Sequence, residues 1–179
     1  MNMSIPVISG AIQNVSKKLG FDVRASYNMF TNSLKKEIYA LNKEVFGPSF
    51  ITQSKTLDNL QEIDGVLVIT IRGAREGKLI GYAIGSKKPP FPPEEPEEKK
   101  AYYLHWLAIR KDQSNKEIGS ALLRTIKKSA GMLGYTMIDT HCFDDDAQGG
   151  PLRRLYRKNG FQFVKHYSDI KESWMRCPI

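Results

Sequence analysis

In the C-terminal half of the sequence, segments with the hydrophobic pattern of a strand alternate with segments that have the hydrophobic spacing of a helix. This alternation constrains the fold more than any other feature. Residues 102–110 are typical of a strand, whereas apolar residues at helical spacing over 118–133 predict a helix. The elements predicted after them are a strand over 136–143, a helix over 150–159 and strands over 161–167 and 173–177. Strands and helices in this order predict a central sheet that helices cover on both faces.

The N-terminal half supplies the remaining elements of such a sheet. The predicted elements are a strand over 21–27, a long helix that ends at Gly47-Pro48, a short helix over 57–63, and a hairpin of strands over 65–71 and 79–85. The apolar face of the long helix consists of Phe30, Leu34, Ile38, Leu41 and Val45. Residues 5–19 also show helical spacing and predict an N-terminal helix.

Length and composition indicate one domain. A chain of 179 residues with 41% hydrophobic residues fits a single core, so we expect one α/β (α+β) domain over 1–179, with 1–20 as a helical extension. Residues 89–100, rich in proline and glutamate, predict an exposed loop. Residues 1–20 lack the order of a signal peptide, and no apolar run approaches the roughly 20 residues of a membrane span. We therefore expect a cytoplasmic protein without a membrane partner.

Cysteine content and charge exclude several kinds of partner. The two cysteines, Cys142 and Cys177, lie in apolar, strand-like segments, and we expect buried free thiols. No cluster of cysteine, histidine and carboxylate has zinc spacing, so we expect no metal. The net charge of +8 is spread along the chain, which indicates solvated helix faces or an attraction for a polyphosphate, and argues against nucleic acid.

One strand-to-helix joint has the features of an anion site. Leu107, Ala108 and Ile109 end a strand, and a helix follows a short polar loop. The loop and the first helical residues are Ser114, Asn115, Lys116, Glu117, Ile118, Gly119 and Ser120. The first amides of a helix lack internal partners, and together with the helix dipole they attract an anion such as a pyrophosphate.

A second motif lies in the last predicted helix. In Leu155-Tyr156-Arg157-Lys158-Asn159-Gly160-Phe161, a tyrosine occupies the last turns of a short helix, Gly160 permits a left-handed cap, and Phe161 begins a strand. Taken alone, Tyr156 is also compatible with a purely structural aromatic residue of the core.

The two motifs in this order resemble the GNAT acetyltransferase family. The matching parts are Leu107-Ala108-Ile109 with the loop to Gly119, and the Leu-Tyr-x-Lys-x-Gly-Phe signature at 155–161. The resemblance implies a central mixed, mostly antiparallel sheet of six to seven strands flanked by helices. It also implies acetyl-CoA as cosubstrate, bound by residues 107–109 and 114–120, and an amine as acceptor.

The loop departs from the family pattern R/Q-x-x-G-x-G/A at two positions. Ser114 replaces the Arg or Gln, Glu117 replaces the first glycine, and Gly119 keeps the last position. A glutamate repels a pyrophosphate unless its side chain turns to solvent, and Lys116 offsets part of that repulsion. Because backbone amides provide most of the binding, we expect the loop to remain functional.

The resemblance also implies roles for two side chains. Tyr103-Leu104-His105-Trp106-Leu107-Ala108-Ile109 is similar to a strand of serotonin N-acetyltransferase, a member of the family in which histidines help to deprotonate an amine through water. His105 is therefore the candidate general base, and the alternative is a core histidine with one hydrogen bond. Tyr156 is the candidate proton donor to the departing thiolate.

Several alternatives stay open at this stage. Asp144, Asp145 and Asp146 form either a hydrophilic turn or a recognition site for a cationic amine. His141 and His166 are interpreted as structural or surface residues. The main function expected is an acetyl-CoA-dependent N-acetyltransferase, and the alternative is a non-catalytic acyl-CoA sensor on the same fold. The acceptor amine and a homodimer are left open.

Overall fold

The computed structural model describes most of the chain. The described residues are 21–27, 31–47, 65–73, 77–87, 101–114, 117–143, 149–169 and 171–179. The predicted segments over 5–19, 57–63 and 89–100 lie outside them, as do Asn115, Lys116, Asp144, Asp145 and Asp146.

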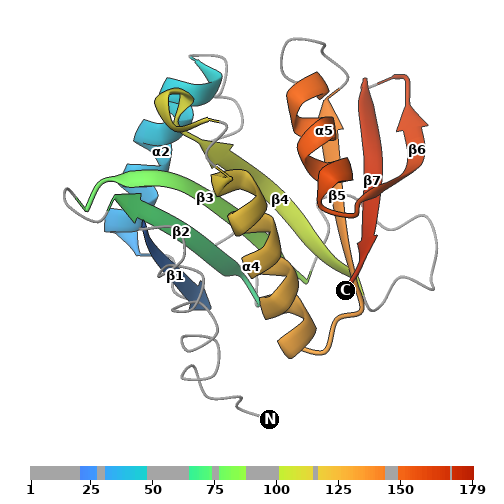
Figure 1. Ribbon diagram of the computed structural model, residues 1–179, viewed down its shortest axis with the longest axis horizontal. Coiled ribbons are helices and arrows are strands. Elements are labelled where there is room, and N and C mark those ends of the chain that lie inside the picture. Colours follow the sequence, from blue (N-terminus) through green and yellow to red (C-terminus); the bar gives the residue numbers. More distant parts are fainter. Residues whose placement is uncertain are drawn as a thin grey trace.

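Seven strands of the described residues form one sheet (Figure 1). The elements in chain order are β1 (Phe21–Tyr27), α2 (Asn32–Phe46), β2 (Leu67–Gly73), β3 (Leu79–Ser86), β4 (Ala101–Ile109), the short 3-10 helix η3 (Lys111–Gln113), α4 (Ile118–Met132), β5 (Met137–Phe143), α5 (Gly149–Lys158), β6 (Gln162–Tyr167) and β7 (Glu172–Pro178). The strand order is β1-β2-β3-β4-β5-β7-β6. Among the strands that the structure describes, only β4 and β5 are parallel neighbours, so the predicted mixed, mostly antiparallel sheet is confirmed.

Helices cover both faces of the sheet because its central strands are apolar on both sides. In β2, Leu67, Ile69 and Ile71 are buried in a core cluster with the inner face of α4. The side chains of Val66 and Val68 point the other way and are buried with α2. The α5 helix joins the α4 cluster, so α4 and α5 share one face and α2 covers the opposite face.

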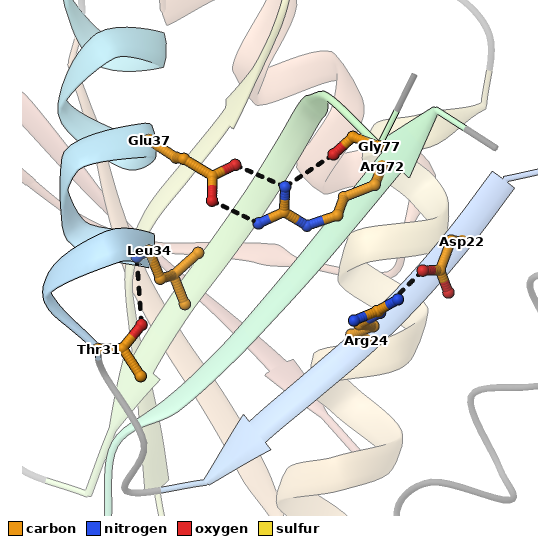
Figure 2. A network of polar contacts seen from close by, with 7 residues as sticks. All are labelled: Asp22, Arg24, Thr31, Leu34, Glu37, Arg72 and Gly77. Carbon is orange, nitrogen blue, oxygen red and sulfur yellow. Dashed lines mark hydrogen bonds and ion pairs between the residues drawn. The ribbon is translucent and has the colours of Figure 1, made fainter. Parts of the chain in front are cut away.

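Polar contacts fix α2 on its face of the sheet. Its N-cap is Thr31, whose hydroxyl accepts the Leu34 amide at 3.2 Å. Figure 2 shows Glu37 of α2 bridging to Arg72 of β2 through two hydrogen bonds, of 2.5 and 2.9 Å. These contacts anchor the helix at its first turns and set its register against the sheet.

A bulge in β4 changes the sheet at its centre. In the β3–β4 ladder, Ile84 faces Trp106 and Gly85 faces Leu104, which leaves His105 as an extra residue in β4. The parallel ladder from β4 to β5 ends at the same level, with the pair Leu104 and Thr140. Beyond this point the two strands diverge in Figure 1.

At the last pair of β4 and β5, a side-chain hydrogen bond takes the place of the next backbone hydrogen bond of the ladder. The Thr140 hydroxyl donates to the Leu104 carbonyl at 3.0 Å, and both residues are buried. A hydroxyl that satisfies the last carbonyl lets the strands separate without leaving that carbonyl unpaired in the core. The bulge and this contact together define where the sheet opens.

Gly85 lies opposite the bulge, and its close packing can be tested by substitution. A Cβ at Gly85 would lie 2.8 Å from the Tyr103 carbonyl oxygen and 2.5 Å from a Tyr102 ring carbon. We expect Gly85→Ala to lower the free energy of unfolding by about 1–3 kcal/mol, measured by urea titration. Gly131→Ala is the control, because a Cβ there meets nothing closer than 4.0 Å and the helix gains propensity. Equal stability of the two variants would contradict this account of the bulge.

Candidate functional site

Tyr156 lies at the point where β4 and β5 separate. The α5 helix carries it into the core, where it is 2% exposed and packs against Phe161 with ring centroids 5.1 Å apart. Its phenol lies beside the side chain of Thr140, the residue that closes the β4–β5 ladder. Burial raises the pKa of the Tyr156 phenol above its ordinary value, so the phenol keeps its proton through the neutral range.

The end of α5 holds Tyr156 in this position. Gly160 has a φ of 88° and continues the chain out of the helix in the left-handed conformation. The Phe161 amide then donates to the Tyr156 carbonyl at 3.0 Å. The local signature predicted this cap, and the structure confirms that it connects the helix to the next strand.

His105 occupies the bulge on the other side of the junction. Its Nε2 lies 2.7 Å from the hydroxyl oxygen of Ser86, a fully buried residue at the end of β3. The ring also meets Tyr103 edge-on, with centroids 4.8 Å apart. His105 is half-buried, so the bulge holds an oriented imidazole that is not fully sealed in the core.

A second imidazole joins His105 through Tyr103. The Tyr103 phenol is hydrogen-bonded to Nδ1 of His141 on β5. Burial raises the pKa of Tyr103 and lowers the pKa of His141, so the phenol donates and the neutral imidazole accepts. His105, Tyr103 and His141 therefore form a continuous group of rings across β4 and β5.

The sequence pattern alone indicates only a structural or surface role for His141. Its position was recoverable from the alternation of the predicted strand over 136–143, because Ile138 and Cys142 turn into the core with α5 and the side chain of His141 must point the other way. The contact of His141 with Tyr103 cannot be predicted from the sequence, because it depends on the register of the parallel ladder between β4 and β5.

The sequence predicts an anion site at the N-terminus of α4, where the N-cap residue makes no side-chain capping bond. Its N-cap, Glu117, adopts φ 60° and ψ 5°, the left-handed conformation, and makes no side-chain capping bond. The contrast with α2 is direct, because there Thr31 caps the helix with its hydroxyl. The first amides of α4, from Ile118 to Ser120, are left without a cap from the N-cap side chain, as an anion site requires.

The Glu117 carboxylate is held by α5. Its Oε1 accepts from the ammonium of Lys158 at 2.6 Å, and both side chains are exposed. The hydrogen bond to Lys158 lowers the pKa of Glu117, which stays ionised and paired. The predicted offset from Lys116 lies outside the described residues, and Lys158 of the second motif supplies the compensating charge.

Gly119 and Ser120 connect α4 to α5. A Cβ at Gly119 would lie 2.7 Å from a Leu155 methyl and 3.0 Å from an Ile109 methyl, so only glycine permits this close packing. The buried Ser120 hydroxyl accepts from the side-chain amide of Asn159 at 3.1 Å. The glycine retained from the family pattern therefore serves the contact between α4, α5 and β4.

The other predicted binding residues lie along the same path. Ala108 is buried, and Leu107 and Ile109 are half-buried against the α4 cluster. Ser114 is exposed and donates its hydroxyl to the Lys111 carbonyl at 2.8 Å, which closes the η3 turn. The end of β4 lies beside the start of α4, because a Cβ at Gly119 would meet the Ile109 side chain.

Three further observations concern the described residues. The thiols of Cys142 and Cys177 are free and buried, as predicted. No group of three or more histidine, cysteine or acidic side chains within the described segments is arranged to hold a metal ion. None of the helices in that part of the chain has the length and apolarity needed to cross a membrane.

Comparison with known families now identifies the class of protein. Residues 35–161 match the profile of the Acetyltransferase (GNAT) family. The match covers more than half of the chain, and this chain belongs to the GNAT acetyltransferase family. No curated protein sequence gives a significant match.

Solved structures share the fold at low sequence identity. The ribosomal-protein-S18-alanine N-acetyltransferase of Escherichia coli has a TM-score of 0.64 and 17% identity, with 88% of this chain and 94% of that chain covered. The PaiA N-acetyltransferase of Thermoplasma acidophilum, solved with coenzyme A, has a TM-score of 0.67 and 13% identity, with 88% and 99% covered. Ard1 from Thermoplasma volcanium has a TM-score of 0.61 and 19% identity, with 88% and 97% covered.

The backbone at Glu117 predicts an unusual response to substitution. A non-glycine residue at positive φ is strained, and the glutamate occupies the place of a family glycine. We expect Glu117→Gly to melt at a higher temperature than Glu117→Ala, measured by thermal unfolding, although both variants lose the Lys158 contact. If the two variants melted at the same temperature, the left-handed conformation at this residue would be contradicted.

Proposed function

We propose that this chain is an N-acetyltransferase that moves the acetyl group of acetyl-CoA to a primary amine by direct attack. The observation that carries the proposal is the position of Tyr156, a buried and protonated phenol at the junction where β4 and β5 part. An uncapped helix N-terminus lies on one side of this junction, and the half-buried His105 on the other. Membership of the GNAT family supports the same reaction.

The residues present fit the pyrophosphate of an acyl-CoA. The left-handed Glu117 begins α4 without a side-chain cap, so the amides of Ile118, Gly119 and Ser120 at the start of the helix receive no bond from its carboxylate. Because the Glu117 carboxylate is bound to Lys158, its charge is partly neutralised beside the proposed anion site. We assign these three amides to the diphosphate and the edge of β4 beyond Leu104, which has no β5 partner, to the pantetheine chain.

The proposed reaction needs one base and one acid. Most free amines are protonated at neutral pH, and only the neutral amine attacks a thioester. His105 takes, through a water molecule, the proton that the ammonium must lose and passes it to solvent. The neutral nitrogen then forms its bond to the acetyl carbon and gives up its second proton to the same base. The carbon–sulfur bond breaks, its electron pair goes to sulfur, and the thiolate takes the proton of the Tyr156 phenol. His105 releases its proton to solvent and Tyr156 regains one from solvent, so the products are an N-acetyl amide and the free thiol.

The backbone of β4 completes the proposed site. We assign the thioester oxygen, as negative charge develops on it, to a backbone amide of β4 between Leu107 and Ile109, where the strand does not pair with β5. Most of the rate gain is expected from holding the amine and the thioester in contact at the junction. The Tyr156 phenol lies beside the buried Thr140, which places it next to this contact.

A non-catalytic acyl-CoA sensor is the second candidate, and the glutamate at the start of α4 favours it. An ionised carboxylate at the position of a family glycine weakens the attraction for a diphosphate, even when paired with Lys158. A sensor would bind acyl-CoA without releasing its thiol in the presence of any amine.

One assay tests both roles. We expect the wild-type protein to release free coenzyme A thiol when acetyl-CoA is supplied with a panel of primary amines. Tyr156→Phe should lower kcat by about 100-fold or more and leave the KM for acetyl-CoA nearly unchanged, because the phenol acts only as the thiolate departs. His105→Gln should lower kcat/KM and remove a titration between pH 5 and 8.

Matched variants control this assay. Tyr39→Phe on α2 and His166→Gln, an exposed residue on β6, make the same chemical changes away from the junction. Both controls should keep wild-type rates. Unchanged turnover in Tyr156→Phe would remove the phenol from the mechanism, and absence of thiol release with every amine would favour the sensor.

A further inference from the structure

The half of the sheet made by β5, β7 and β6 presents a distinct set of side chains on the face opposite α5. On β7, Met175 and Cys177 are buried with α5, so alternation turns Glu172, Trp174 and Arg176 to the other face. The ladder places His141 of β5 opposite Trp174, and Phe143 opposite Glu172. Tyr167 of β6 lies opposite Glu172 on the other side.

Aromatic rings dominate this face, and cations already lie on two of them. The His141 ring is 5.7 Å from the Tyr167 ring and 6.4 Å from the Trp174 ring, between centroids. The Arg176 guanidinium lies 4.8 Å from the centre of the Trp174 ring, and the Lys165 ammonium 4.9 Å from that of Tyr167. The electron-rich faces of these rings therefore suit positive groups.

On this face of the sheet, Arg176 is paired with a carboxylate, whereas Glu172 has no ion-pair partner among the described residues. Two hydrogen bonds, both 2.8 Å long, pair Arg176 with the buried Asp139. By contrast, no ion pair joins Glu172 to another side chain anywhere in the described part of the chain. Burial raises the pKa of this half-buried carboxylate, and its charge is felt by the phenol of Tyr103. A partly desolvated carboxylate beside aromatic rings is costly unless a cation binds it.

Glu172 lies next to the proposed acyl-transfer junction. Its ladder partner Phe143 belongs to the stretch of β5 beyond Thr140, which no longer pairs with β4. Phe143 is 47% exposed although it is a large apolar residue. An acceptor that reaches the junction from the His105 side would therefore extend along His141 and Phe143 toward Glu172.

This carboxylate cannot serve the amine that reacts. A nearby negative charge stabilises the protonated amine and raises its pKa, whereas attack on the thioester needs the neutral form. A carboxylate is useful only to a second positive group on the acceptor, held away from the reacting nitrogen.

We propose that the face formed by Glu172, His141, Phe143 and Tyr167 binds the distal ammonium of an acceptor with two amines, of the α,ω-diamine class. This inference rests on the proposed acetyltransferase function. The near amine loses its proton at His105, while the distal amine stays charged between the carboxylate and the rings. The same geometry gives a simple monoamine no corresponding contact.

A binding measurement tests the proposal without catalysis. Calorimetric titration of the full chain with 1,4-diaminobutane should show binding that is about 10- to 100-fold weaker in Glu172→Gln, because the variant loses a partly desolvated charge contact. Asp169→Asn, an exposed residue of the β6–β7 turn, removes the same charge and should bind as the wild type. Equal affinities of Glu172→Gln and the wild type, or weakening by both variants alike, would overturn the proposal.

The acetylation assay separates this proposal from the proposed function. With acetyl-CoA, the wild type should favour 1,4-diaminobutane over butylamine in kcat/KM by about 10-fold or more, and Glu172→Gln should lose this preference while keeping its rate with butylamine. Acetylation of both amines at equal kcat/KM would reject the diamine site and leave the acetyltransferase intact. If neither amine is acetylated yet the calorimetric difference persists, the binding site stands and the proposed reaction fails.

Discussion

The structure depends on the short parallel ladder between β4 and β5. The ladder runs from the pair Ala101 and Met137 to the pair Leu104 and Thr140, and it stops at the level of the His105 bulge. A bulge adds twist to its strand, so β4 turns away from β5 while still pairing with β3. Without that divergence the sheet would close, and there would be no open strand edge at its centre for a ligand to meet.

The junction brings together groups from both faces of the sheet. Tyr156 reaches it from α5 and lies beside Thr140, while His105 and Tyr103 occupy the face of the sheet opposite α5. The proposed proton donor and the proposed base thus lie on opposite faces of the sheet at this junction. Such separation suits a transfer in which the acyl donor and the amine approach from different faces.

The two sequence motifs form one structural unit. Lys158 and Asn159 of the second motif bind Glu117 and Ser120 at the start of α4, and Leu155 packs on Gly119. The contacts explain how the first helical turn of α4 stays ordered with a glutamate in the left-handed conformation. The exposed Glu117–Lys158 pair is weak by itself, and the buried packing of Gly119 fixes the two helices more firmly.

Local patterns predicted the elements and part of the site. The alternation in 136–143, the helical spacing in 118–133 and the glycine cap at Gly160 depend on neighbouring residues, and all three are confirmed. The bulge at His105, the Tyr103–His141 contact and the Glu117–Lys158 pair depend on residues far apart in the chain. They follow from strand register and helix packing, which no local period encodes.

The central claim is that an acyl-CoA binds across this junction, with its diphosphate on the amides of α4. The most direct measurement is titration of isotope-labelled protein with coenzyme A, followed by amide chemical shifts in NMR spectra. The chemical shifts of the Ile118, Gly119 and Ser120 amides should change together with those of the β4 amides after Leu104. The chemical shift of the capped Leu34 amide of α2 should not change. Shifts elsewhere with none at the start of α4 would contradict the account.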